Sequence, residues 1–173
     1  MRNIIARARS FAALAHTGQV RKYSGEPYIV HPVAVAHIVA SVPHTSEMLA
    51  AALLHDVVED TDTTVLDINK LFGRDVAMLV ENLTDVSRPE HGNRKRRKAL
   101  DRAHTAKACA NAKTIKLADV IHNTSDIVAN DPGYAVVYCK EKALLLEVLK
   151  EGDASLWERA SKQIEEGIKH ECS

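Results

Sequence analysis

The chain has 173 residues, of which 46% are hydrophobic and 27% charged, and its 23 Lys and Arg residues balance 23 Asp and Glu residues to a formal net charge of +0. A chain of this length can bury a core without disulfides or structural metal, which excludes a stapled miniprotein and a disordered tail. Gly and Pro are few, so the composition predicts an all-α protein.

The first half of the chain predicts a series of helices interrupted by one ordered loop. Apolar residues recur at helical spacing up to Gly18, and residues 18–30 carry the Ser, Gly and Pro of a loop. Pro32 suits the first turn of the next helix and places His31 just outside its entrance. Ser46 caps the helix after that, and Thr64 with Asp67 forms a capping box. The expected helices cover residues 3–17, 32–41, 46–58, 64–73 and 75–83.

The second half begins with a polar loop around residues 89–92. Amphipathic patterns then predict helices over residues 94–109, 113–128, 134–149 and 155–170. No internal repeat or interdomain linker separates them, so we expect one domain over residues 1–173.

The cysteines and the N-terminal residues indicate the cellular compartment of the protein. Cys109, Cys139 and Cys172 are odd in number and have no CxxC spacing, which is typical of reduced thiols rather than a disulfide framework or a zinc ribbon. Residues 1–11 include arginines among their apolar residues, so they lack the apolar stretch of a signal peptide or membrane span. We therefore expect a cytoplasmic protein that makes no membrane contact.

Charge is distributed unevenly along the chain. The stretch 45–69 has no Lys or Arg and six acidic residues, whereas 88–116 has ten basic residues against Glu90 and Asp101. An acidic segment able to hold a cation, combined with a basic segment able to hold an anion, is typical of metal-assisted phosphate chemistry. Two solvated helix faces are the alternative that charge alone leaves open.

The segment AALLHDVVEDT, residues 51–61, places four ionisable groups in one apolar helix. Helical spacing puts His55 and Glu59 on one face and Asp56 and Asp60 on the adjacent face. The result is two layers, a His-Asp pair and a carboxylate pair. Buried charge of this kind needs a cation or Arg and Lys partners to compensate it.

A second polar stripe occurs in KLADVIHN, residues 116–123, where Asp119 and Asn123 lie one turn apart among apolar residues. His31 supplies a third polar group. Imidazole and carboxylate ligands without thiolate suit manganese, iron, magnesium or zinc. Each feature alone is explained by capping or surface exposure. A His, a His-Asp pair and a distant Asp in this order, however, resemble the HD superfamily of metal-dependent phosphohydrolases.

Longer motifs narrow the resemblance. The stretch AHTGQVRKYSGEPYIVHPVAVA, residues 15–36, followed by AALLHDVVEDT and IKLADVIHN, resembles the hydrolase domain of RelA/SpoT proteins and their single-domain relatives, the small alarmone hydrolases. The resemblance implies a single-domain HD-type helical bundle without a synthetase domain. It also implies that one manganese ion (Mn2+) is held by His31, His55, Asp56 and Asp119, and that Glu59 and Asp60 form the acid/base pair.

The same resemblance places guanosine recognition on the loop containing Arg21, Lys22 and Ser24, with Asn123 reaching the nucleotide. The basic stretch before the KLAD motif, which meets phosphate in the small hydrolases, corresponds to RKRRK and points to Arg94, Arg97 and Lys98. Because five consecutive basic residues cannot all face one pocket, most of them are expected to form a solvated face. Tyr138 and Lys142 stand where the relatives place an aromatic residue and an arginine near the substrate.

One segment departs from the family pattern. After KLAD the family continues with a basic residue and a Leu-Met or Leu-Arg ending, whereas this chain has Val120, Ile121, His122, Asn123, Thr124 and Ser125. We expect this difference in sequence to affect nucleotide specificity more than metal binding.

The sequence predicts metal-dependent removal of pyrophosphate from the 3′ position of (p)ppGpp, giving GDP or GTP. Two alternatives are an HD phosphohydrolase for another nucleotide, such as NADPH or a deoxynucleotide, and a nucleotide-sensing module without turnover. The presence of both Glu59 and Asp60 favours catalysis. Zero net charge and an aromatic content of 4% disfavour nucleic-acid binding. The oligomeric state is left open.

Overall fold

The computed structural model describes residues 3–169, and these residues are α-helical throughout apart from loops, one 3-10 turn and an isolated antiparallel bridge between Val20 and Pro27. The prediction of an all-α protein is confirmed. Contacts concentrate within two compact units that meet in the sequence between Thr84 and Asp85. The organisation as a single domain over residues 1–173 stays a prediction.

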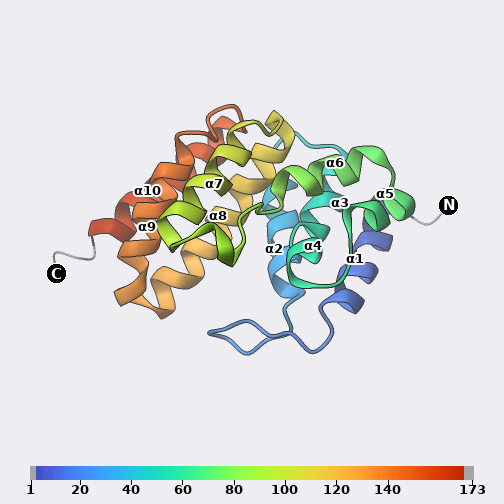
Figure 1. Ribbon diagram of the computed structural model, residues 1–173, viewed down its shortest axis with the longest axis horizontal. Helices are drawn as coiled ribbons and strands as arrows, with labels where there is room; N and C mark the ends of the chain where they lie inside the picture. The colour runs from blue at the N-terminus through green and yellow to red at the C-terminus, as the bar shows by residue number, and fades with distance from the viewer. Residues whose placement is uncertain (1–2, 170–173) are drawn as a thin grey trace. The chain divides into compact units, whose positions relative to one another are not determined.

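The first unit, coloured blue to green in Figure 1, is built around one short helix whose residues are apolar from Met48 onward. Its helices are α1 (Ile4–Ala15), α2 (Val30–Val39), α3 (Ser46–Leu54), α4 (Val57–Asp60), α5 (Val65–Phe72) and α6 (Arg74–Leu83). Residues 50–54 of α3 are all buried because α1, α2 and α6 pack around this helix. The packed helices therefore fix the position of the C-terminal end of α3, which is followed by His55.

Three local features of this unit differ from the sequence prediction. The helix expected to run through residue 58 ends at Leu54, and α4 begins separately at Val57, so His55 and Asp56 occupy the junction. Helix α2 begins at Val30, which puts His31 inside its first turn. Pro32 permits this because the first turn does not need its missing N–H. The hydroxyl of Thr45, rather than Ser46, caps α3.

The second unit packs three long helices against one another (Figure 1). It contains the 3-10 turn η1 (Pro89–His91), α7 (Arg94–Ala106), α8 (Ala110–Asn130), α9 (Pro132–Leu146) and α10 (Ala154–Lys169). A Cβ at Gly167 of α10 would come within 2.5 Å of the Cys139 sulfur of α9, so this glycine sets the close approach of the two helices. Among the described residues, Cys109 and Cys139 form no disulfide, and Cys172 lies outside these residues.

Candidate metal centre and substrate pocket

The first unit brings three predicted ligands together at the junction between α3 and α4. One ligand atom from each of His31, His55 and Asp56 can be chosen so that all three lie within 4.8 Å of one another. The Oδ2 atom of Asp56 is 3.1 Å from Nε2 of His55 and 3.4 Å from Nε2 of His31. Both histidines are almost completely buried, whereas Asp56 is partly exposed.

The hydrogen bonding of His55 fits a metal ligand. Its Nδ1 atom lies 2.8 Å from the carbonyl oxygen of Ala52 and donates to it, so in the neutral imidazole Nε2 carries the lone pair that a metal would need. The nearby Asp56 oxygen is also an electron-pair donor. The Asp56 carboxylate oxygen and the imidazoles of His55 and His31 surround one point and can together coordinate a divalent cation. A set of nitrogen and oxygen ligands without thiolate is typical of such an ion.

The predicted acid/base pair lies beside this cluster. Glu59 and Asp60 occupy α4, and the backbone N–H of Asp60 donates a 2.9 Å hydrogen bond to the carbonyl oxygen of Asp56. Burial, followed by the negative charge of Asp56, raises the pKa of Asp60, although His16 and the Tyr28 hydroxyl act in the opposite direction. A carboxyl group with a raised pKa is suited to hold and release a proton near neutral pH.

The loop before α2 carries three of the predicted substrate residues. Its backbone folds back on itself, since Arg21 N–H donates to Glu26 and Tyr28 N–H donates to Gln19. The Arg21 guanidinium lies 5.8 Å from the centre of the Tyr28 ring. Lys22 contacts the Tyr23 ring, and the Ser24 hydroxyl accepts from the N–H of Glu26.

The same loop contains residues that the sequence prediction missed. The Tyr28 hydroxyl donates a 2.7 Å hydrogen bond to Oδ2 of Asp56. The Gln19 side chain connects Nδ1 of His16, at 2.7 Å, with the carbonyl oxygen of Asp60, at 3.0 Å. These residues lie in the motif of residues 15–36 that resembles the family. The motif alone does not indicate which of its side chains contact Asp56 or Asp60.

The second unit holds the remaining predicted residues. Asp119 of α8 is buried, forms an ion pair with Lys116 at 3.3 Å and accepts a 2.6 Å hydrogen bond from the Asn123 amide. On α9 the Lys142 ammonium lies 5.1 Å from the centre of the buried Tyr138 ring. Asn123, which the sequence places one turn from Asp119, thus contacts it directly.

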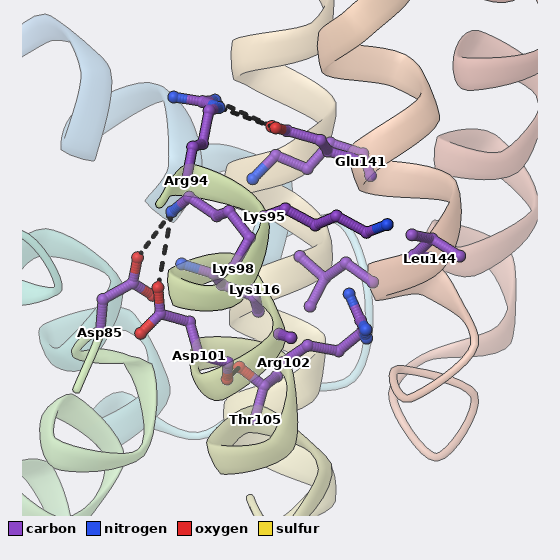
Figure 2. Close-up of a pocket in the computed structure, with 13 residues that line it drawn as sticks. Asp85, Arg94, Lys95, Lys98, Asp101, Arg102, Thr105, Lys116, Glu141 and Leu144 are labelled. Atoms are coloured by element: carbon purple, nitrogen blue, oxygen red, sulfur yellow. Dashed lines mark hydrogen bonds and ion pairs between the residues drawn. The ribbon is translucent and has the colours of Figure 1, made fainter. Parts of the chain in front are cut away.

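Of the basic run, only part faces a cavity. A cavity of about 390 Å³ is lined by Arg94, Lys95 and Lys98 but not by Arg97, and Lys142 lines it from α9. Arg94 also donates to Glu141 (Figure 2). A further hydrogen bond runs from Arg94 to the Tyr134 hydroxyl. The sequence prediction did not find the cavity residues Asp85 and Lys116, because nothing in their spacing links them to the basic run.

A model of the HD domain family matches residues 8–142, which is more than half of the chain. The chain belongs to the HD-domain family. The predicted resemblance to the HD superfamily is therefore confirmed, and His31, His55 and Asp56 lie close enough together to hold a metal ion.

Relatives of this HD domain include two named ppGpp enzymes. The guanosine-3′,5′-bis(diphosphate) 3′-pyrophosphohydrolase MESH1 of Drosophila melanogaster is 43% identical over 125 residues, which are 70% of this chain and 68% of that protein. The bifunctional (p)ppGpp synthase/hydrolase SpoT of Escherichia coli is 46% identical over 112 residues, or 63% of this chain. The chain spans only 16–17% of the length of SpoT and similarly long relatives.

A solved structure supports the same family. It is described as a metazoan ortholog of SpoT that hydrolyzes ppGpp, and it matches this HD domain with a TM-score of 0.85 and 32% identity over 96% of both chains. None of the described helices is long and apolar enough to cross a membrane.

Proposed function

We propose that this HD domain hydrolyses (p)ppGpp at the 3′ position and releases pyrophosphate together with GDP or GTP. The observation that carries the proposal is the cluster of His31, His55 and Asp56 directly preceding Glu59 and Asp60. Support comes from relatives of 43% and 46% identity whose names describe a ppGpp 3′-pyrophosphohydrolase and a (p)ppGpp synthase/hydrolase. The cysteine pattern supports a cytoplasmic location.

The metal in this proposal is one Mn2+ ion. His31, His55 and Asp56 would hold it, and we propose Asp119 as a fourth ligand because the family resemblance places one at this position of KLAD. A divalent ion bound there would polarise a phosphoryl oxygen and lower the pKa of water toward ~7.

Glu59 and Asp60 would accept and donate the protons that are transferred in the reaction. Glu59 accepts a proton from the attacking water, whose oxygen forms a bond to the 3′ phosphorus. The bond between that phosphorus and the 3′ oxygen breaks, and Asp60 supplies a proton to the leaving oxygen. The raised pKa of Asp60 supports this division of roles, because an acid must retain its proton until the leaving group needs it.

Nucleotide recognition is assigned to the polar residues that the family resemblance indicates. Arg21, Lys22 and Ser24 would contact guanosine and phosphate from the loop, and Asn123 would act from α8. Arg21 already lies over the face of an aromatic ring, a geometry that a purine can also accept. The remaining proposed contacts are Arg94, Arg97, Tyr138 and Lys142.

The deciding experiment is a substrate screen with product identification. Purified protein with manganese is incubated with ppGpp, pppGpp, NADPH and deoxynucleotides, and products are resolved by chromatography and mass spectrometry. We expect GDP and pyrophosphate from ppGpp. Hydrolysis of NADPH or a deoxynucleotide with ppGpp left intact would contradict the proposed substrate. Binding of ppGpp without turnover of any compound would support a sensor instead.

A further inference from the structure

Helix α4 is a single turn that carries both members of the proposed acid/base pair. It covers Val57–Asp60, and Val57 is the buried residue among its four. A turn of this length is not stable on its own, because helix nucleation fixes several backbone angles for one hydrogen bond. The positions of Glu59 and Asp60 therefore depend on contacts that other parts of the first unit make with α4.

Two side chains bind the carbonyl groups with which α4 ends. The Thr61 hydroxyl donates a 2.6 Å hydrogen bond to the carbonyl oxygen of Val57. The Gln19 side-chain amide donates a 3.0 Å hydrogen bond to the carbonyl oxygen of Asp60. The last carbonyls of a helix lack partners within it, so both bonds stabilise the C-terminal end of α4. Of the two side chains, Gln19 reaches α4 from a distant part of the chain, the loop after α1.

His16 fixes the direction of the Gln19 side chain. Its Nδ1 atom lies 2.7 Å from the Oε1 atom of Gln19. Because the Asp60 carbonyl can only accept, Gln19 presents its amide nitrogen to Asp60 and its oxygen to His16. Nδ1 of His16 is therefore the donor. The backbone N–H of Gln19 also donates to the carbonyl oxygen of His16, at 3.0 Å, which keeps the two residues together.

The imidazole of His16 is buried although one of its nitrogens is unpaired. The exposed fraction of His16 is 3%, and its ring centre lies 4.7 Å from that of Tyr28. With the proton on Nδ1, Nε2 of the neutral ring carries a lone pair, and it has no hydrogen-bond partner among the described residues. A buried polar atom without a partner destabilises a fold. Packing alone therefore does not account for a histidine at this position.

We propose that His16 is a positioning residue for Asp60, because it orients the Gln19 amide that holds the C-terminal end of α4. The inference rests on the proposed function, in which Asp60 supplies a proton to the leaving 3′ oxygen. Proton transfer needs the two groups within hydrogen-bond distance, and a displacement of about 1 Å can lower a rate ~10²-fold. His16 itself touches no substrate in this proposal.

The kinetic test compares His16→Phe and Gln19→Met with the wild type. Both substitutions keep the approximate size of the side chain and break the contact between His16 and Asp60. We expect kcat for ppGpp at saturating manganese to fall about tenfold or more in each variant. KM should change less than about twofold, because neither side chain is proposed to bind the nucleotide. His44→Phe is the matched control, since His44 is exposed and its Nδ1 atom lies 2.7 Å from a carbonyl oxygen of its own loop.

Two further variants separate this pathway from a general loss of packing. The side-chain amide introduced by His16→Asn lies near the position of Nδ1 and can donate to Gln19, so most of the lost kcat should return. In the double variant His16→Phe/Gln19→Met the losses should not add, because both substitutions break the same series of contacts. Gln19→Met keeps any charge that His16 carries, so a loss in that variant is due to the contact rather than to charge.

Amide hydrogen exchange supplies a readout that needs no turnover. Mass spectrometry follows exchange in peptides that cover residues 57–61, without substrate or metal. We expect faster exchange there in His16→Phe and Gln19→Met, because α4 opens more often when the Gln19 amide no longer holds the Asp60 carbonyl. The melting temperature of His16→Phe should not fall, because the unpaired Nε2 atom is removed. A purely structural role for His16 predicts a lower melting temperature with kcat unchanged.

Any of the following results would overturn the proposal: unchanged kcat in His16→Phe, a rise in KM without a fall in kcat, additive losses in the double variant, or unchanged exchange over residues 57–61. A kcat in His16→Asn as low as in His16→Phe would exclude Nδ1 as the acting atom and overturn it as well. A wild-type protein that leaves ppGpp intact would contradict the proposed function instead. The exchange data would then still decide whether His16 and Gln19 hold α4.

Discussion

Tyr28 donates a 2.7 Å hydrogen bond to Oδ2 of Asp56, the oxygen that also lies closest to the two histidines of the cluster. The Tyr28 ring also contacts the His16 ring, with ring centres 4.7 Å apart, and the Arg21 guanidinium lies 5.8 Å from its centre. Outer hydrogen-bond partners orient metal ligands and tune their affinity. Tyr28 therefore connects the candidate nucleotide loop to the candidate metal centre.

Tyr28→Phe removes only this hydroxyl and keeps the ring contacts. We expect manganese affinity to fall by about 10–100-fold, the range seen when outer-shell partners of metal ligands are lost. Isothermal titration with manganese measures the change. Tyr23→Phe serves as the control because that hydroxyl accepts from Lys22 in the same loop. Equal manganese affinities in the two variants would show that Tyr28 does not position Asp56.

Metal binding should stabilise the fold by mass action, by about 2.7 kcal/mol at an ion concentration of 100 times Kd. We expect His55→Ala and Asp119→Ala each to lose this response in a thermal melt. His37→Ala, an exposed histidine on the helix that carries His31, should keep it. A full response in His55→Ala would reject the cluster, and one in Asp119→Ala alone would remove Asp119 from the ligand set.

The helices and the His-Asp cluster could be predicted because their signals are local. Thr64 and Asp67 form the predicted capping box, and His55 and Asp56 lie in one short motif. The role of Tyr28 could not be predicted, since it depends on how the loop returns to the end of α3. The surroundings of Asp85 depend likewise on side chains from α7, α8 and α9, which sequence spacing does not bring together.

Asp60→Asn separates chemistry from metal binding. The substitution keeps the size of the side chain but removes its titratable proton, so we expect turnover of ppGpp to fall by about 10²-fold or more. The manganese-induced rise in melting temperature should persist, since Asp60 is not a proposed ligand. Asp62→Asn is a nearby control outside the acid/base pair. Near-normal turnover of Asp60→Asn would exclude Asp60 from the mechanism.

Arg21→Ala tests the nucleotide loop. If Arg21 contacts guanosine equally in the ground state and the transition state, its loss raises KM for ppGpp much more than it lowers kcat. Steady-state kinetics at saturating manganese provide both constants. A fall in kcat with unchanged KM would place Arg21 in the chemical step instead. The metal-induced thermal shift should match that of the wild type.

Lys142 makes stability depend on pH in a defined direction. Its folded-state pKa of about 8 lies below the ordinary value of 10.5, because burial and Lys116 outweigh the attraction of Asp119 and Asp85, with Lys98 adding to the repulsion. Between pH 8 and 10.5 the Lys142 side chain is more fully protonated in the unfolded chain than in the folded protein. The free energy of unfolding therefore increases as pH rises from about 8 to 10.5. This added stability is lost as pH falls through 8. The methionine side chain of Lys142→Met does not titrate between pH 8 and 10.5. We therefore expect the difference in unfolding free energy between wild type and Lys142→Met, measured by denaturant titration, to shift in favour of the wild type over this interval. A difference that stays constant from pH 7 to 10.5 would show that Lys142 keeps an ordinary pKa.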